Sequence, residues 1–288
     1  MLQSLTSGRR SALQVVTLTT VAMLAFAANS LLCRLALKET DIDAASFTAI
    51  RLVSGALLLA LLLARSSRSA PQGSWRGAAA LLLYALAFSF AYVELDAGMG
   101  ALLLFGAVQL SMLLFGLWQG ERLAPLASAG LFMAAAGLLA LLLPGASAPP
   151  AGSALMMIAA GIAWGAYSLL GRGAKDPLAA TAGNFMRAAP LALLAVLLML
   201  PTLRWDAAGA AYAVLSGALA SGVGYAIWYA ALPSLSSMQA SIVQLSVPVI
   251  AALAGVALLD EQLTLGMLLP GCAVLGGIAL VLAARRPR

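Results

Sequence analysis

Long apolar runs separated by short polar segments make up nearly the whole of this chain. Each run is near the ~20 residues that an α-helix needs to cross the hydrocarbon core of a bilayer. Backbone groups in lipid must be satisfied within the segment, and no strand-like alternation is visible, so the pattern predicts helices. The ten expected spans are 13–37, 44–64, 76–95, 98–118, 124–143, 152–171, 179–199, 208–231, 236–258 and 263–283.

Composition places the protein in a membrane and removes several chemistries. Of the 288 residues, 63% are hydrophobic and 9% are charged, whereas soluble domains carry roughly 25% charged residues. The sequence has no histidine, two isolated cysteines and no G-x-x-x-x-G-K-[ST] motif. We therefore expect no cofactor, no metal site and no ATP-driven step. A membrane enzyme is disfavoured for want of a nucleophile or metal cluster.

The distribution of basic residues predicts the orientation. With the N-terminus in the cytoplasm, eleven arginines and lysines fall in cytoplasmic segments and three fall outside. This is the positive-inside pattern, so both termini are expected in the cytoplasm of a bacterial-type inner membrane. Because the basic residues lie in short loops and form no basic face, nucleic-acid binding is not expected.

Matched charges suggest that the chain is an internal repeat. Ser-Leu-Leu-x-Arg ends at Arg34 and again at Arg172, 138 positions later. Arg51 matches Arg187 at an offset of 136, and Glu121 matches Glu261 at an offset of 140. Charges are rare in this chain, so three matches at nearly one offset predict two related halves, 1–146 and 147–288.

Five spans per half make the second half an upside-down copy of the first. This inverted-repeat plan is typical of secondary transporters, in which the substrate site lies between the halves near the bilayer midplane. The fold class expected is thus an all-α membrane protein of ten transmembrane helices in two inverted five-helix repeats.

The same features resemble the drug/metabolite transporter superfamily, specifically its ten-helix members built from two EamA-type domains. The resemblance rests on the arginine in the second helix of each half and on Gly120-Glu121-Arg122-Leu123, with its second-half copy Asp260-Glu261-Gln262-Leu263. Size and aromatic spans are most similar to the YddG-type amino-acid exporters of bacteria. One departure is Val108, which stands where the second half has Pro248.

Polar and aromatic residues inside the spans are the candidates for the substrate path. Buried amides more often bond a neighbouring helix than a substrate, and an aromatic stripe is more often structural than part of a pocket. A cavity lined by tyrosine and tryptophan nevertheless suits an amphipathic solute. The candidates are Asn29, Tyr84, Phe88, Tyr92, Gln109, Trp164, Tyr167, Asn184, Tyr225 and Gln244.

Three further residues carry expectations of their own. Arg51 and Arg187 lie roughly 10–12 Å from a span end, where a charge is costly and marks a site by default. Each could bind a carboxylate or, as we favour, serve as a gate or structural lock. Pro248 is expected in mid-span, where it would kink the helix and free the Gln244 carbonyl.

All ten aspartates and glutamates sit at or beyond the ends of the spans, and none lies deep inside one. Ion-coupled carriers usually bury a carboxylate for the ion, so we expect facilitated diffusion of small amphipathic solutes, above all neutral or aromatic amino acids, outward through the bilayer. The rival is an exporter of cationic drugs or metabolites. A monomer is compatible with the pattern, which does not fix the oligomeric state.

Overall fold

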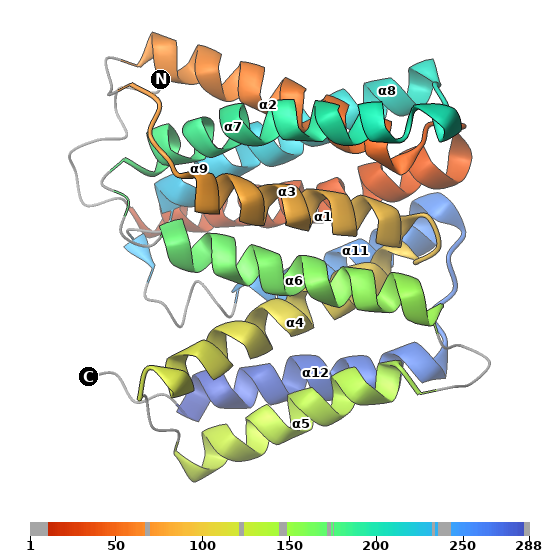
Figure 1. Cartoon of the computed structure of the whole chain (residues 1–288). Helices are drawn as coiled ribbons and strands as arrows, with labels where there is room; N and C mark the ends of the chain where they lie inside the picture. The colour runs from red at the N-terminus through yellow and green to blue at the C-terminus, as the bar shows by residue number, and fades with distance from the viewer. Residues whose placement is uncertain are drawn as a thin grey trace.

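The chain folds into a bundle of helices running nearly side by side (Figure 1). The computed structural model describes residues 11–66, 70–120, 124–143, 149–171, 174, 176–231, 234–235 and 243–284, and in these ranges it contains no strand. Its helices are α1 (Ala12–Glu39), α2 (Ala44–Arg65), α3 (Trp75–Tyr92), α4 (Ala97–Trp118), α5 (Pro125–Leu141), α6 (Ala151–Gly171), α7 (Pro177–Leu198), η2 (Leu200–Thr202), α8 (Ala207–Val214), η3 (Leu215–Val223), α9 (Gly224–Ala231), α11 (Ser246–Leu259) and α12 (Leu265–Ala284).

Within the described residues, eight helices are long and apolar enough to cross a membrane, with α8, η3 and α9 forming one of them. Two shorter apolar helices, Pro125–Leu141 and Ser246–Leu259, fall at the fifth and ninth expected spans. The ninth span was expected to begin at 236, but α11 begins at Ser246, and 236–242 lie outside the described residues. The eighth span is not uniformly α-helical, because η3 is a nine-residue π-helix.

Side-chain caps fix where several helices begin. The Asp43 carboxylate accepts hydrogen bonds from the backbone N–H groups of Ala45 and Ser46 at the start of α2, both at 2.9 Å. Asp176 caps α7 in the same way. Ser74 caps α3 and Asp206 caps α8. Each cap satisfies N–H groups that have no partner inside the helix.

The interior of the bundle is where the polar side chains lie, and the outside is apolar. Buried polar residues include Asn29, Arg51 and Gln109, while Leu57, Leu139 and Leu269 are each more than 60% exposed. A water-soluble protein arranges these groups the other way round, so the apolar exterior faces lipid. The chain is therefore a multi-pass membrane protein.

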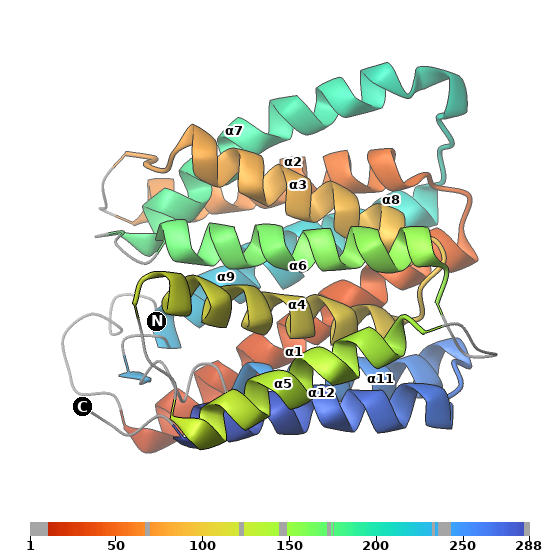
Figure 2. The same ribbon diagram turned by 60° about the horizontal axis from the view of Figure 1, so that its bottom comes forward.

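Helices from the two halves of the sequence lie side by side in the bundle. The strongest pairings are α5 with α12, α3 with α6, α2 with both α7 and η3, and α4 with both α6 and α11. Figures 1 and 2 show α5 and α12 together at one side of the bundle. Gly161 allows α6 to approach α4 closely, since a Cβ there would meet the Leu104 carbonyl oxygen at 2.6 Å. This close approach brings the first and second halves together around the pocket described next.

Candidate functional site

A small pocket lies in the middle of the bundle, between helices of both halves. Helices α1, α3 and α4 contribute seven of its lining residues, and α6 and α9 contribute Trp164 and Tyr225. The space open to the centre of a water molecule is only ≈ 20 Å³, about enough for one water. The full lining is Phe26, Asn29, Ser30, Tyr84, Phe88, Leu104, Phe105, Trp164 and Tyr225.

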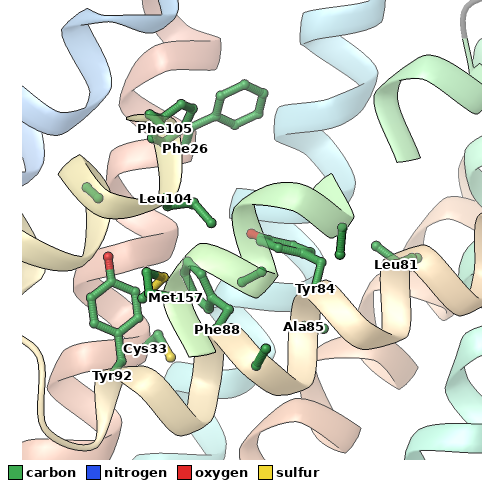
Figure 3. Close-up of a cluster of buried hydrophobic side chains, with 14 of the residues drawn as sticks. Phe26, Cys33, Leu81, Tyr84, Ala85, Phe88, Tyr92, Leu104, Phe105 and Met157 are labelled. Carbon is green, nitrogen blue, oxygen red and sulfur yellow. The ribbon is translucent and has the colours of Figure 1, made fainter. Parts of the chain in front are cut away.

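Aromatic rings form most of the pocket wall. Figure 3 shows Tyr84 and Phe88 on one helix, with Phe26, Leu104 and Phe105 on the opposite side. Trp164 joins the two halves, because its ring lies 4.8 Å from that of Tyr84 and 5.1 Å from that of Tyr225, centroid to centroid. Such tilted contacts are favourable. The result is a wall that suits a flat apolar group.

A short chain of hydrogen bonds links η3 to this wall. The Ser216 hydroxyl donates to Asn29 Oδ1 at 2.7 Å, and Asn29 Nδ2 donates to the Tyr84 hydroxyl at 3.4 Å. All three residues are buried. Asn29 and Tyr84 were among the candidates from sequence, whereas Ser216 was not. The chain fixes the Asn29 amide with its carbonyl toward η3 and its NH₂ toward Tyr84.

Arg51 lies directly behind the same rings. Its side chain is 1% exposed, and its guanidinium carbon is 5.2 Å from the Tyr84 ring centroid and 5.0 Å from that of Phe88. Nη2 donates to the Tyr84 hydroxyl at 3.1 Å, and Nε donates to the Ser221 hydroxyl at 3.3 Å. Both rings that it touches belong to the pocket. This places a cation behind the pocket wall, one side chain away from the open space.

The π-helix η3 is what brings its serines to these partners. Ser216 bonds Asn29 of α1, and Ser221 bonds Arg51 of α2, so the wide turn contacts both helices at once. Gly217 lies flat against α2, where a Cβ would collide with the Arg51 carbonyl oxygen. Short π segments inside α-helices occur frequently at functional sites.

Not all of the predicted residues gather at the pocket. Tyr92 and Tyr167 are buried beside it, packing on Phe88 and Trp164 with ring centroids at 4.7 and 5.5 Å. Gln109 is buried on α4 and Gln244 is partly buried, and neither belongs to the lining. Asn184 lies toward one end of the bundle, where its Oδ1 accepts a hydrogen bond from Ser74 N at 2.9 Å.

Arg187 has a setting unlike that of Arg51, although the two occupy matching places in the sequence. It is only partly buried. Its Nη1 donates to the carbonyl oxygens of Gln72 and Gly183, both at 2.8 Å. Arg187 thus holds the α2–α3 segment against α7, which is a structural contact between the halves.

Pro248 lies just after an interruption of the helical run. It is the third residue of α11, in the first turn, and Leu245 just before that helix is a turn residue. A proline in the first turn removes an N–H that has no helical partner there. Val243 and Gln244 are also helical, so the helical run breaks at Leu245, next to the carbonyl that Pro248 is predicted to free. The kink itself stays a prediction.

Charged groups tie several helices together at the end of the bundle where α1 ends. Arg34 Nη2 lies 3.3 Å from Asp96 Oδ1, and Arg34 Nε lies 3.5 Å from Glu261 Oε1. Both Glu261 oxygens accept the Ala97 N–H at 2.9 Å. Burial raises the pKa of the Glu261 carboxyl and nearby Asp96 adds to this, although the Ala97 N–H and Arg34 oppose it.

The sequence places each of these charged residues near a span end, but it does not show that they are neighbours in space. Arg34, which ends the repeated Ser-Leu-Leu-x-Arg string, is 8% exposed and paired with two acids. The residue that matches Arg34 in the second half of the repeat, Arg172, lies outside the described residues, and so does Glu121. Opposite charges near the end of α1, at the start of α4 and after α11 are the signal in the sequence, but which of them become neighbours depends on the tertiary fold.

Comparison with known proteins identifies the family. Residues 152–283 match the model of the EamA-like transporter family. An uncharacterised Pseudomonas aeruginosa protein, PA1977, is 63% identical over 273 residues, which are 94% of this chain and 95% of the relative. The chain belongs to the EamA-like transporter family. It is thereby a member of the drug/metabolite transporter superfamily.

A solved crystal structure supports the fold of this EamA-like protein. The two superpose with a TM-score of 0.69 at 20% sequence identity, covering 96% of this chain and 99% of the other. At that identity the likeness concerns the fold alone. The family match and the apolar exterior agree that the protein is a membrane transporter.

Proposed function

We propose that this EamA-like protein exports small amphipathic solutes, foremost neutral and aromatic amino acids, by alternating access. The observation that carries the proposal is the aromatic pocket between helices of the first and second halves. A pocket in that position can be exposed to either side of the membrane when the halves rock. Its rings suit an apolar side chain, and its amide and hydroxyl groups suit a polar head.

The inverted repeat that alternating access requires is supported by mirrored contacts. Gln72 N–H donates to the Ala179 carbonyl at 2.9 Å, joining the α2–α3 segment to the start of α7. Asp43 N–H donates to the Arg204 carbonyl at 3.2 Å, joining the segment before α8 to the start of α2. The two contacts join matching segments with the halves exchanged, although the loop residue donates in the first and accepts in the second. Helices α2 and α7 run in opposite directions, as Figures 1 and 2 show.

Orientation and coupling follow from the charges. The start of α1 and the end of α12 lie at one end of the bundle (Figures 1 and 2), which agrees with two cytoplasmic termini in an inner membrane. The buried Glu261 lies in the segment between α11 and α12, outside the spans. It is at the opposite end of the bundle from the start of α1 and the end of α12. With no carboxylate in the spans to carry a proton through the pocket, transport is downhill diffusion of the solute.

The pocket argues against the cationic rival. A cation entering it meets the buried guanidinium of Arg51 behind Tyr84 and Phe88, and none of the ion pairs in the described part of the chain neutralises Arg51. Like charges in a low-dielectric interior repel strongly.

Counterflow in proteoliposomes tests the function. Vesicles preloaded with unlabelled phenylalanine, leucine or lysine are diluted into the labelled compound, with and without a pH gradient. We expect transient accumulation of phenylalanine and leucine, little of lysine, and no effect of the gradient. Flux of cationic dyes without flux of amino acids would overturn the proposal. A strict need for a pH gradient would overturn its uncoupled form. Empty liposomes are the control.

A further inference from the structure

Arg51 has a hydrogen-bonding group that the described residues leave unused. Its Nη1 is buried, and no hydrogen-bond partner is found for it in the part of the chain that the structure describes. Nε and Nη2 are each satisfied by a hydroxyl. A buried cation paired only with neutral groups is costly in a membrane protein, and such residues commonly mark substrate or ion pathways.

The Tyr84 hydroxyl has the same unused capacity. Its oxygen accepts hydrogen bonds from Arg51 Nη2 and from Asn29 Nδ2. Those two donors occupy both acceptor positions of a phenol oxygen, so its own O–H remains free to donate. Among the described contacts no acceptor receives it. Tyr84 also lines the pocket. The chain from Ser216 through Asn29 to Tyr84 therefore leaves the Tyr84 O–H as an unused donor at the pocket wall.

Two unused donors, one of them cationic, define a receptor for an anion. Guanidinium and hydroxyl donors form short, charge-assisted bonds to a carboxylate. The remaining wall is apolar, with Phe26, Phe88 and Phe105 among its residues. Phosphate groups are larger and doubly charged, and the described site offers a single cation to balance them. The match is to one carboxylate joined to an apolar or aromatic body.

We propose that Arg51 and Tyr84 form the carboxylate subsite of the transport pocket. Building on the function proposed above, this makes the substrate a monocarboxylate whose head accepts hydrogen bonds from Arg51 Nη1 and the Tyr84 O–H. The open space of ≈ 20 Å³ is too small for such a solute, so the Tyr84 and Phe88 rings that cover the guanidinium swing aside as it binds. In the site the Arg51 guanidinium balances the carboxylate charge, so no additional cation is required there.

The test is a competition series on phenylalanine counterflow in wild-type proteoliposomes. The competitors are 3-phenylpropionate, which keeps the carboxylate alone, phenethylamine, which keeps the amine alone, and phenylalanine amide. We expect 3-phenylpropionate to inhibit at concentrations at least tenfold lower than either amine. Equal inhibition by all three would overturn the carboxylate subsite while leaving amino-acid transport standing. Absence of phenylalanine flux would overturn both proposals.

Substitutions then locate the subsite. Arg51→Gln is expected to raise the KM for phenylalanine at least tenfold and to abolish the preference for 3-phenylpropionate over phenethylamine, while Tyr84→Phe weakens that preference. Arg187→Gln, at the matching intramembrane position, is the control and should keep it. Arg51→Lys should recover part of the preference because it restores the charge. If Arg51→Gln elutes as a folded species in detergent and still prefers the carboxylate, Arg51 is not the receptor. If Arg51→Gln does not fold, the test rests on Tyr84→Phe. An unchanged preference for 3-phenylpropionate in that variant would likewise overturn the carboxylate subsite.

Discussion

Asp43 shows how one residue at a helix end can hold together both halves of the chain. Its carboxylate caps α2 through Ala45 and Ser46 and also accepts the Arg204 N–H at 3.0 Å. Burial alone would raise the pKa of this carboxyl, but hydrogen bonds from the Ser46 N–H and hydroxyl and from the Arg204 and Ala45 N–H groups outweigh it and lower the pKa. Ionised Asp43 therefore stabilises the folded state.

The sign of that shift gives a pH dependence. A lowered pKa means that the stabilisation is complete above the ordinary value of 3.8 and is lost as the pH falls through the folded value. Asp43→Ala should lose about 1 kcal/mol at pH 7, as for other helix caps. The gap in melting temperature between wild type and Asp43→Ala, measured in detergent, should shrink from pH 7 to pH 3.

Asp43→Asn is the matched control, because it keeps a capping oxygen without the charge. Its melting temperature at pH 7 should lie between those of wild type and Asp43→Ala. A gap between wild type and the variants that stays constant down to pH 3 would show that ionisation of Asp43 contributes nothing.

At the scale of the element, η3 decides the geometry of the site. A regular α-helix over Leu215–Val223 would turn Ser216 and Ser221 through different angles, and the bonds to Asn29 and Arg51 would not both form. The sequence there reads as an ordinary small-residue helix. Gly217 has no Cβ, and this lets η3 pack directly against the backbone of α2.

This contact predicts the effect of adding a single methyl group. Gly217→Ala places a Cβ against the Arg51 carbonyl oxygen and the Ser54 hydroxyl, so overpacking should destabilise the protein by about 1–3 kcal/mol. Phenylalanine counterflow should fall as well, because Arg51 and Ser221 move apart. Thermal unfolding in detergent together with transport measures both effects.

Gly152→Ala is the corresponding control in α6. A Cβ at Gly152 would meet nothing within 4 Å, and alanine favours a helix over glycine, so stability should stay equal or rise. If the two alanine variants melt at the same temperature, the close contact between η3 and α2 does not exist in the membrane.

For the whole molecule, different contacts join the segments at the two ends of the bundle. Where α1 ends, Arg34, Asp96 and Glu261 join three segments, and Lys38 donates to the Leu259 carbonyl at 2.8 Å. At the other pole, Arg187 and Asn184 of α7 hold the backbone near Gln72 and Ser74.

Inverted repeats predict opposite sides for matching helix ends. Arg65 ends α2 and Leu200 follows α7, and both are exposed. In a background lacking Cys33 and Cys272, a membrane-impermeant maleimide applied to intact cells should label Leu200→Cys at once. It should label Arg65→Cys only after permeabilisation. Asp41→Cys, just before α2, is the control for the outer side. Labelling of positions 65 and 200 from one side would contradict the inverted plan.

The sequence by itself determined that this protein is helical and in lipid, because hydrophobic period and scarcity of charge are local properties that no tertiary contact can reverse. It also indicated Asn29, Tyr84, Phe88, Trp164 and Tyr225, since polar and aromatic side chains inside apolar runs are conspicuous. Only the tertiary structure decided that these five share a pocket and that Gln109 and Gln244 do not line it. It likewise separated Arg51 from Arg187, which the repeat treated as equals. The physical reason is that burial and hydrogen-bond partners depend on which helices become neighbours, and on a π turn in η3 that leaves no trace in the hydrophobic pattern.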